Sequence, residues 1–173
     1  MTSKARVLVV ANRTVDSSEL IATLRQRAAQ SPACFTLLVP AVPRGLAWAA
    51  DMKAGSREAA PRAGAGVRRM RMAGLEIEAA IVGDPDPFAA VGDILRTSQF
   101  DEMVVATLPH GVSRWLRLSL PHRLRRITDL PVFHVTPIRG APATVFGAPS
   151  RPVSLCETSP RGRLPAEHLY SPS

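Results

Sequence analysis

Short, uninterrupted apolar runs rich in valine are the feature that most constrains the fold of this chain. Ala5 to Ala11 reads ARVLVVA, Cys34 to Val39 reads CFTLLV, and Met103 to Ala106 is a third such run. Runs of this kind are typical of strands buried on both faces of a parallel sheet. We therefore expect the first run to form the central strand of such a sheet, and Pro40 to end the second strand.

Amphipathic segments separate the apolar runs. The segment from Asp16 to Gln30 begins with Asp16 placed to cap a helix and has Glu19 three residues on. Its apolar residues fall on one helical face, namely Leu20, Ile21, Leu24 and Ala28. Further along, Asp86 is placed to cap a helix and Pro87 to occupy its first position. The buried face of that helix would carry Phe88, Val91, Ile94 and Leu95.

The stretch from Pro40 to Gly66 gives weak signals, because proline and glycine interrupt every helical window. We expect a long loop there, with a short helical turn near residues 46–52. A helix over residues 67–73 would end at Gly74 in a left-handed cap, and Leu75 to Val82 would form a half-exposed edge strand.

The last two elements are a helix over Ser119 to Thr128 and a strand over Pro131 to Val135. The inward face of this helix would carry Leu120, Leu124 and Ile127. His134 would be a packed core or interface histidine of the fifth strand.

This alternation of strands and helices predicts an α/β fold over residues 1–138, a five-stranded parallel, doubly wound, Rossmann-like sheet with helices on both faces. A ligand would bind outside the carboxyl ends of the strands, where the strand order reverses. Residues 139–173 are rich in Pro, Ser and Arg, and we expect them to form a disordered tail.

Composition limits the function classes. No apolar run is long enough to span a membrane and the amino terminus lacks a signal peptide, so we expect a cytoplasmic protein. Cys34 and Cys156 have the spacing of neither a disulfide framework nor a zinc site, and we expect free thiols. The net charge of +8 invites a nucleic-acid partner, yet nearly all basic residues are Arg, as a GC-rich genome produces. We therefore do not expect nucleic-acid binding.

Three stretches carry a family resemblance: VLVVANRTVDSSEL, GLEIEAAIVGDPDPFAAVGDIL, and the segment from Asp101 to Val135. In their order and spacing they resemble the universal stress protein family. That resemblance implies the α/β fold above, a stress-associated regulatory role, ATP or another adenine nucleotide as ligand, and a homodimer formed through the last strand, here Val132 to Val135. A protein partner also fits such a role.

The resemblance assigns five candidate nucleotide-binding positions. Asn12 stands where the family has an Asp that contacts the adenosine half, and Val39 stands where the backbone contacts adenine. In the family's phosphate loop, G-x2-G-x9-G-(S/T/N), the two leading glycines correspond to Ala106 and Pro109. Ser119 falls at the third glycine, or at the hydroxyl position if one residue is deleted.

The loop departs from the family pattern where the amide donors matter. Glycines let the backbone approach phosphate oxygens, and Pro109 has no N–H to offer. Pro121 would remove another amide from the first turn of the fourth helix. An anion site would remain if His110, Arg114 and Arg117 face the cleft; otherwise the two arginines face water.

No catalytic or metal site is predicted. Asp84, Asp86 and Asp93 are better explained as turn, cap and solvated residues. Ser113 and the histidines lack the G-x-S-x-G elbow of a hydrolase.

We therefore expect a regulatory binding module with weak or lost ATP binding rather than an enzyme. One alternative is retained adenine-nucleotide binding, through Asn12 and Ser119 and with slow hydrolysis at most. A second alternative is polyanion binding through the arginines at 114, 117, 123, 125 and 126.

Overall fold

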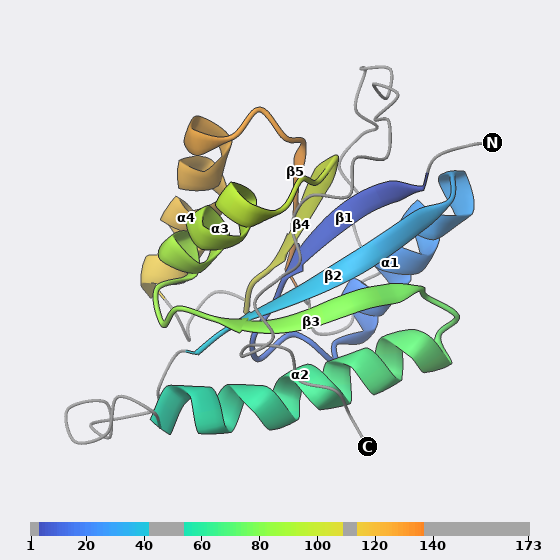
Figure 1. Cartoon of the computed structure of the whole chain (residues 1–173), viewed down its shortest axis with the longest axis horizontal. Coiled ribbons are helices and arrows are strands. Elements are labelled where there is room, and N and C mark those ends of the chain that lie inside the picture. Colours follow the sequence, from blue (N-terminus) through green and yellow to red (C-terminus); the bar gives the residue numbers. More distant parts are fainter. Residues whose placement is uncertain (1–3, 42–53, 109–113, 137–173) are drawn as a thin grey trace.

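The computed structural model of the chain describes residues 4–41, 54–108 and 114–136, and within residues 54–56 and 114–119 it describes the backbone alone. A central sheet is covered by helices on both faces (Figure 1). The elements in chain order are β1 (Ala5–Val10), α1 (Ser18–Gln30), β2 (Ala33–Pro40), α2 (Ala54–Met72), β3 (Ile77–Gly83), α3 (Pro87–Thr97), β4 (Glu102–Ala106), α4 (Arg114–Ile127) and β5 (Val132–Val135).

The five strands are parallel and lie in the order β3-β2-β1-β4-β5. The predicted fold class is confirmed, with β1 at the centre and β3 at an edge. The order reverses between β1 and β4, whose registers place Val10 beside Leu38 on one side and Val105 on the other. The carboxyl ends of β1, β2 and β4 therefore lie next to one another.

Two apolar layers hold the helices on the sheet. Side chains of β1 alternate between them, with Val7 and Val9 in one layer and Leu8 and Val10 in the other. The first layer receives α1 and α2, through Leu20, Leu24, Ala59, Ala63, Val67 and Met70. The second receives α3 and α4, through Ala90, Val91, Ile94, Leu120 and Leu124. A chain with apolar residues on both faces of its strands folds this way because each face needs a cover.

Helix α2 corrects the sequence expectation. A loop was predicted up to Gly66, yet the helix begins at Ala54 and runs through Pro61 without ending. Every third or fourth residue of its inner face is buried, at Ala59, Ala63, Val67 and Met70. Apolar packing outweighs the local cost of proline and glycine here, because most helical stability in proteins comes from tertiary contacts. The short turn expected near residues 46–52 and the tail from 139 lie outside the described residues.

The helix ends were predicted with mixed success. Gly74 adopts φ of 80° after α2, so the predicted left-handed cap is confirmed. Asp86 accepts a hydrogen bond from the Phe88 N–H (3.1 Å) ahead of Pro87, as expected. Asp16, however, is exposed, and the cap of α1 is Ser17, whose hydroxyl accepts from the Leu20 N–H at 3.3 Å.

Helix α4 also differs from its prediction. It begins at Arg114 rather than at Ser119, so Pro121 lies inside the helix and not in its first turn. Leu120 and Leu124 are buried as expected, but Ile127 is 48% exposed at the end of the helix. The helix ends before its last apolar residue reaches the core.

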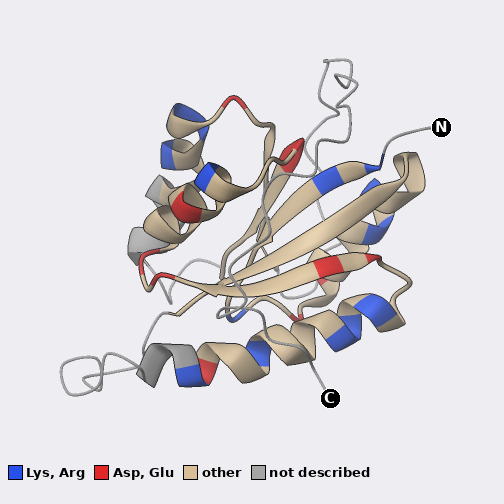
Figure 2. Cartoon of the chain, viewed as in Figure 1, with Lys and Arg blue, Asp and Glu red and all other residues tan. Residues whose placement is uncertain are grey.

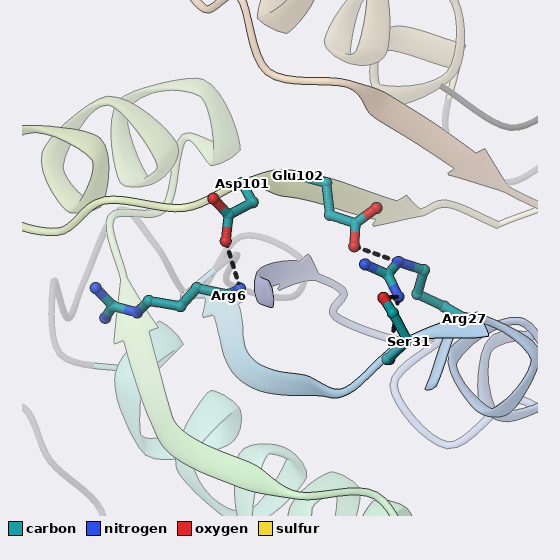
Figure 3. Close-up of polar contacts among 5 residues, drawn as sticks. All are labelled: Arg6, Arg27, Ser31, Asp101 and Glu102. Atoms are coloured by element: carbon teal, nitrogen blue, oxygen red, sulfur yellow. Dashed lines mark hydrogen bonds and ion pairs between the residues drawn. The ribbon is translucent and has the colours of Figure 1, made fainter. Parts of the chain in front are cut away.

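The amino end of the sheet is closed by ionic contacts (Figure 3). The Asp101 carboxylate accepts from the Arg6 N–H at 2.7 Å, and Arg27 of α1 pairs with Glu102 at the start of β4. Arg27 also donates to the Ser31 hydroxyl at 2.9 Å. Burial raises the pKa of Glu102 despite the opposing pull of Arg27. These contacts tie β1 and α1 to the start of β4.

Candidate functional site

Three of the five predicted site residues meet at the carboxyl ends of adjacent strands. Val39 is the penultimate residue of β2, Ala106 is the last residue of β4, and Asn12 follows β1 by two positions. Val39 is fully buried, backbone included. Pro109 and the side chain of Ser119 lie outside the described residues. The structure thus brings together the adenosine half of the predicted site and describes only part of the phosphate half.

The carboxamide of Asn12 is engaged at both ends. Its Nδ2 donates to the carbonyl oxygen of Pro40, the last residue of β2, at 2.9 Å. Its Oδ1 accepts from a terminal nitrogen of Arg62, on α2, at 2.8 Å. Because Asn12 brings no charge, this bond leaves the guanidinium charge of Arg62 in place. The polar atoms expected to contact adenosine are therefore already partnered inside the protein.

Arg62 is the site residue that the sequence prediction missed. Its guanidinium also pairs with Glu58, one turn earlier on α2, at 3.0 Å. A predicted loop at this position gave no reason to place Arg62 near Asn12. The helical spacing of the buried residues Ala59, Ala63 and Val67 was the signal that would have placed it on a helix packed against the sheet.

A glycine lets α2 approach the loop after β1. A Cβ built on Gly66 would lie 2.4 Å from Val15 Cγ2 and 3.2 Å from Leu37 Cδ2. Gly66 lies one turn beyond Arg62 on the same helix face, so this close approach brings Arg62 within reach of Asn12.

The buried Thr14 hydroxyl joins the loop after β1 to β4, and the strand order reverses between these two strands. It donates to the carbonyl oxygen of Ala106 at 3.0 Å. This bond ties the loop after β1 to the end of β4, between the strands where a ligand of this fold class is expected. The carbonyl of Ala106 at the start of the predicted phosphate loop is thus also engaged.

The amino terminus of α4 keeps more anion-binding capacity than the sequence indicated. Since the helix begins at Arg114, its first turn spans Arg114 to Arg117 and contains no proline. Free amides at a helix amino terminus favour anions, so the argument from Pro121 against an anion site is wrong. The argument from Pro109 is unaffected.

A second polar group lies at the ends of β4 and β5. His134 Nε2 is 2.7 Å from the Thr107 hydroxyl and 3.3 Å from the Thr136 hydroxyl. Burial, and next the charge of Arg125, lower the pKa of His134. A lowered pKa favours the neutral form of this half-buried imidazole beside the two hydroxyls.

The described arginines of α4 are partly committed to internal contacts. The Arg123 guanidinium lies over the Phe88 ring, 4.1 Å from its centroid, and Arg125 donates to the Val132 carbonyl at 3.0 Å. Figure 2 shows basic residues on α1, α2 and α4 and at the start of β1. These contacts favour a solvated surface for Arg123 and Arg125 over a polyanion groove. The side chains of Arg114 and Arg117 lie outside the described residues.

Two kinds of feature are absent from the described part of the chain. No helix among those residues combines the length and apolar character needed to cross a membrane. No group of three or more His, Cys, Asp or Glu within them is arranged to hold a metal ion.

Comparison with known proteins defines the fold class. No protein-family model matches the chain, and no curated protein sequence matches it. Among solved structures, a universal stress protein from Archaeoglobus fulgidus is similar, with a TM-score of 0.52 and 16% identity over 75% of this chain and 92% of that one. A universal stress protein family protein from Arabidopsis thaliana with AMP bound has a TM-score of 0.52 and 17% identity, over 76% and 91% of the two chains. The chain has the universal stress protein fold.

Proposed function

We propose that this protein is a universal stress protein-like regulatory binding module in which ATP binding is weak or lost. The observation that carries the proposal is the double engagement of Asn12, by the Pro40 carbonyl and by Arg62. A nucleotide would have to replace these bonds at the adenosine half. Because the new hydrogen bonds would only substitute for existing ones, little affinity would be gained.

The phosphate half supports the same proposal. Ala106 and Pro109 stand at the positions of the leading glycines, and Pro109 has no amide to donate. The Thr14 hydroxyl bonds to the Ala106 carbonyl and fixes the loop after β1 against β4. Opening this contact to admit a triphosphate would expose a buried polar pair.

A thermal melt with ATP tests the proposal. A site filled at about 100 times its dissociation constant would stabilise the fold by roughly 2.7 kcal/mol, which shifts Tm by several degrees. We expect millimolar ATP, with and without Mg²⁺, to leave Tm unchanged. A saturable shift of several degrees would show that ATP binding is retained.

Retained binding of a smaller adenine nucleotide is the second candidate. It is favoured by the uninterrupted first turn of α4, which offers amide donors to one phosphate group. The Arabidopsis thaliana neighbour was solved with AMP bound, which makes AMP the first nucleotide to try. Mass spectrometry of small molecules released by denaturing the freshly purified protein would detect such a ligand, and a melt with AMP would confirm that it binds.

We further propose that the module works as a cytoplasmic homodimer paired through β5. This strand is at an edge of the sheet, with β4 on one side and no strand on the other among the described residues. An unpaired edge presents backbone donors and acceptors to a second copy. Light scattering would give the dimer mass. The carbonyls of Pro131 and Val135 accept from β4, so the alternate residue His134 presents its N–H to the open edge; His134→Pro should therefore reduce the mass to that of the monomer.

A further inference from the structure

Arg62 has binding capacity that its internal contacts leave unused. One terminal nitrogen donates to Asn12 and the other to Glu58, whereas a guanidinium carries further N–H groups in a fixed fork. Those further groups have no partner within the described part of the chain, and 19% of the side chain is exposed. A partly buried cation at the end of β1 is thus available to an incoming group.

The charge of Arg62 is only partly compensated. Its one ionic partner in the described residues, Glu58, is 38% exposed and sits four residues earlier on the same helix. Ion pairs of this kind are screened by water and contribute little. Asn12 positions the guanidinium without neutralising it, whereas an acid at that position would pair with it and cancel its charge.

We propose that Arg62 makes the carboxyl end of β1 and β2 a subsite for the oxyanion of a small ligand, a phosphate or a carboxylate, and that Arg62 determines this specificity. This inference rests on the proposed binding function of the same site and names the class of its ligand. Arginine suits the role because its planar fork binds two oxygens of an oxyanion at once. The neutral Asn12 holds the fork in place.

The test uses the full-length protein and three probes, AMP, adenosine and succinate, titrated at constant ionic strength and followed by amide chemical shifts. AMP and adenosine differ by the phosphate alone, and succinate supplies carboxylates without a nucleoside. Binding of AMP or succinate should weaken by about tenfold or more in Arg62→Gln. Arg68→Gln removes the same charge from an exposed position of the same helix and should bind as the unmodified protein does.

Two further variants separate a binding role for Arg62 from a structural one. Asn12→Asp keeps the contact to Arg62 but neutralises the guanidinium, and it also removes the donor to the Pro40 carbonyl. Succinate, which has no adenosine to contact position 12, is the probe for this variant and should bind more weakly. Glu58→Gln removes the competing carboxylate and should strengthen anion binding. A merely structural Arg62 predicts no loss in Asn12→Asp and no gain in Glu58→Gln, and these variants keep the test decisive if Arg62→Gln does not fold.

Different measurements would overturn this inference and the proposed function. The inference is overturned if neither AMP nor succinate binds at millimolar concentration, or if their binding survives both Arg62→Gln and Asn12→Asp. The proposed function fails on a different readout, namely tight binding of ATP by the unmodified protein. The probe that binds identifies the oxyanion as phosphate or carboxylate.

Discussion

Thr14 is a single residue on which the geometry of the site depends. Its hydroxyl is buried and donates to the carbonyl of Ala106, which is itself buried. In Thr14→Val the carbonyl loses its partner, and we expect a loss of about 1 to 3 kcal/mol in the free energy of unfolding. Urea denaturation measures it. Thr14→Ser keeps the hydroxyl and is the control; an equal loss in both variants would contradict the role of the bond.

His134 gives the fold a pH dependence whose sign can be worked out. Its pKa in the folded protein lies below the ordinary value of 6.5, from burial and from Arg125. The neutral form is thus favoured on folding, so its stabilisation is present above about pH 6.5 and is lost as pH falls toward the folded pKa.

The prediction from His134 is a difference between two denaturation series. The unmodified protein should lose more unfolding free energy between pH 8 and about pH 5.5 than His134→Gln does, since Gln does not titrate. Contributions from other groups, Glu102 included, are common to both proteins and cancel. His122→Gln on the exposed face of α4 is the matched control. An equal loss of unfolding free energy between pH 8 and about pH 5.5 in His134→Gln and the unmodified protein would contradict the prediction.

At the scale of residues, the site residues at the strand ends could be predicted from the sequence, but their hydrogen-bond partners could not. The family resemblance assigned Asn12, Val39 and Ala106 as site positions, and all three lie at or just after strand ends, which a parallel sheet presents together. The bonds from Arg62 and Thr14 were not predictable, because they join positions far apart in the chain. Such contacts depend on how α2 and the loop after β1 pack in three dimensions.

Helix α2 is the element that connects packing to the site. Gly66→Ala would place its Cβ 2.4 Å from Val15 Cγ2, too close for two carbon atoms, so the helix or Val15 would have to shift. We expect overpacking to cost about 1 to 3 kcal/mol of unfolding free energy, more than the gain in helix propensity of roughly 1 kcal/mol. Thermal and urea denaturation would measure the loss.

A glycine in another helix provides the control for Gly66. Gly92 lies in α3, and a Cβ there would meet nothing within 4 Å. Gly92→Ala should therefore stabilise the protein by about 0.5 to 1 kcal/mol. If both variants were stabilised, the close approach of α2 to the loop after β1 would be refuted.

At the scale of elements, local signals failed where tertiary packing decided the outcome. Proline and glycine led to a predicted loop over residues that form the first part of α2, and the start of α4 was placed at Ser119, five residues too late. In both helices the proline is tolerated because buried residues on the inner face hold the surrounding turns, Ala59 and Ala63 in α2 and Leu120 and Leu124 in α4. Strands were predicted better, because a short continuous apolar run is typical of a strand buried on both faces of a parallel sheet.

For the whole molecule, the α/β domain should be separable from the chain that follows it. The composition of residues 139–173 predicts a tail without a core of its own. A protein ending at Ile138 should keep the Tm of the full chain, as measured by circular dichroism. Limited proteolysis of the full chain should give a fragment of similar length. A fall of several degrees on truncation would mean that the tail packs against the domain.

The central claim is that a universal stress protein fold here carries a site whose ATP contacts are occupied by the protein itself. Isothermal titration of the full-length protein with ATP in the presence of Mg²⁺ tests this most directly. The bonds of Asn12 and Thr14 predict a dissociation constant in the millimolar range or weaker, or no measurable heat. A saturating one-to-one isotherm in the micromolar range would contradict the account and would show that these side chains release their partners to bind the nucleotide.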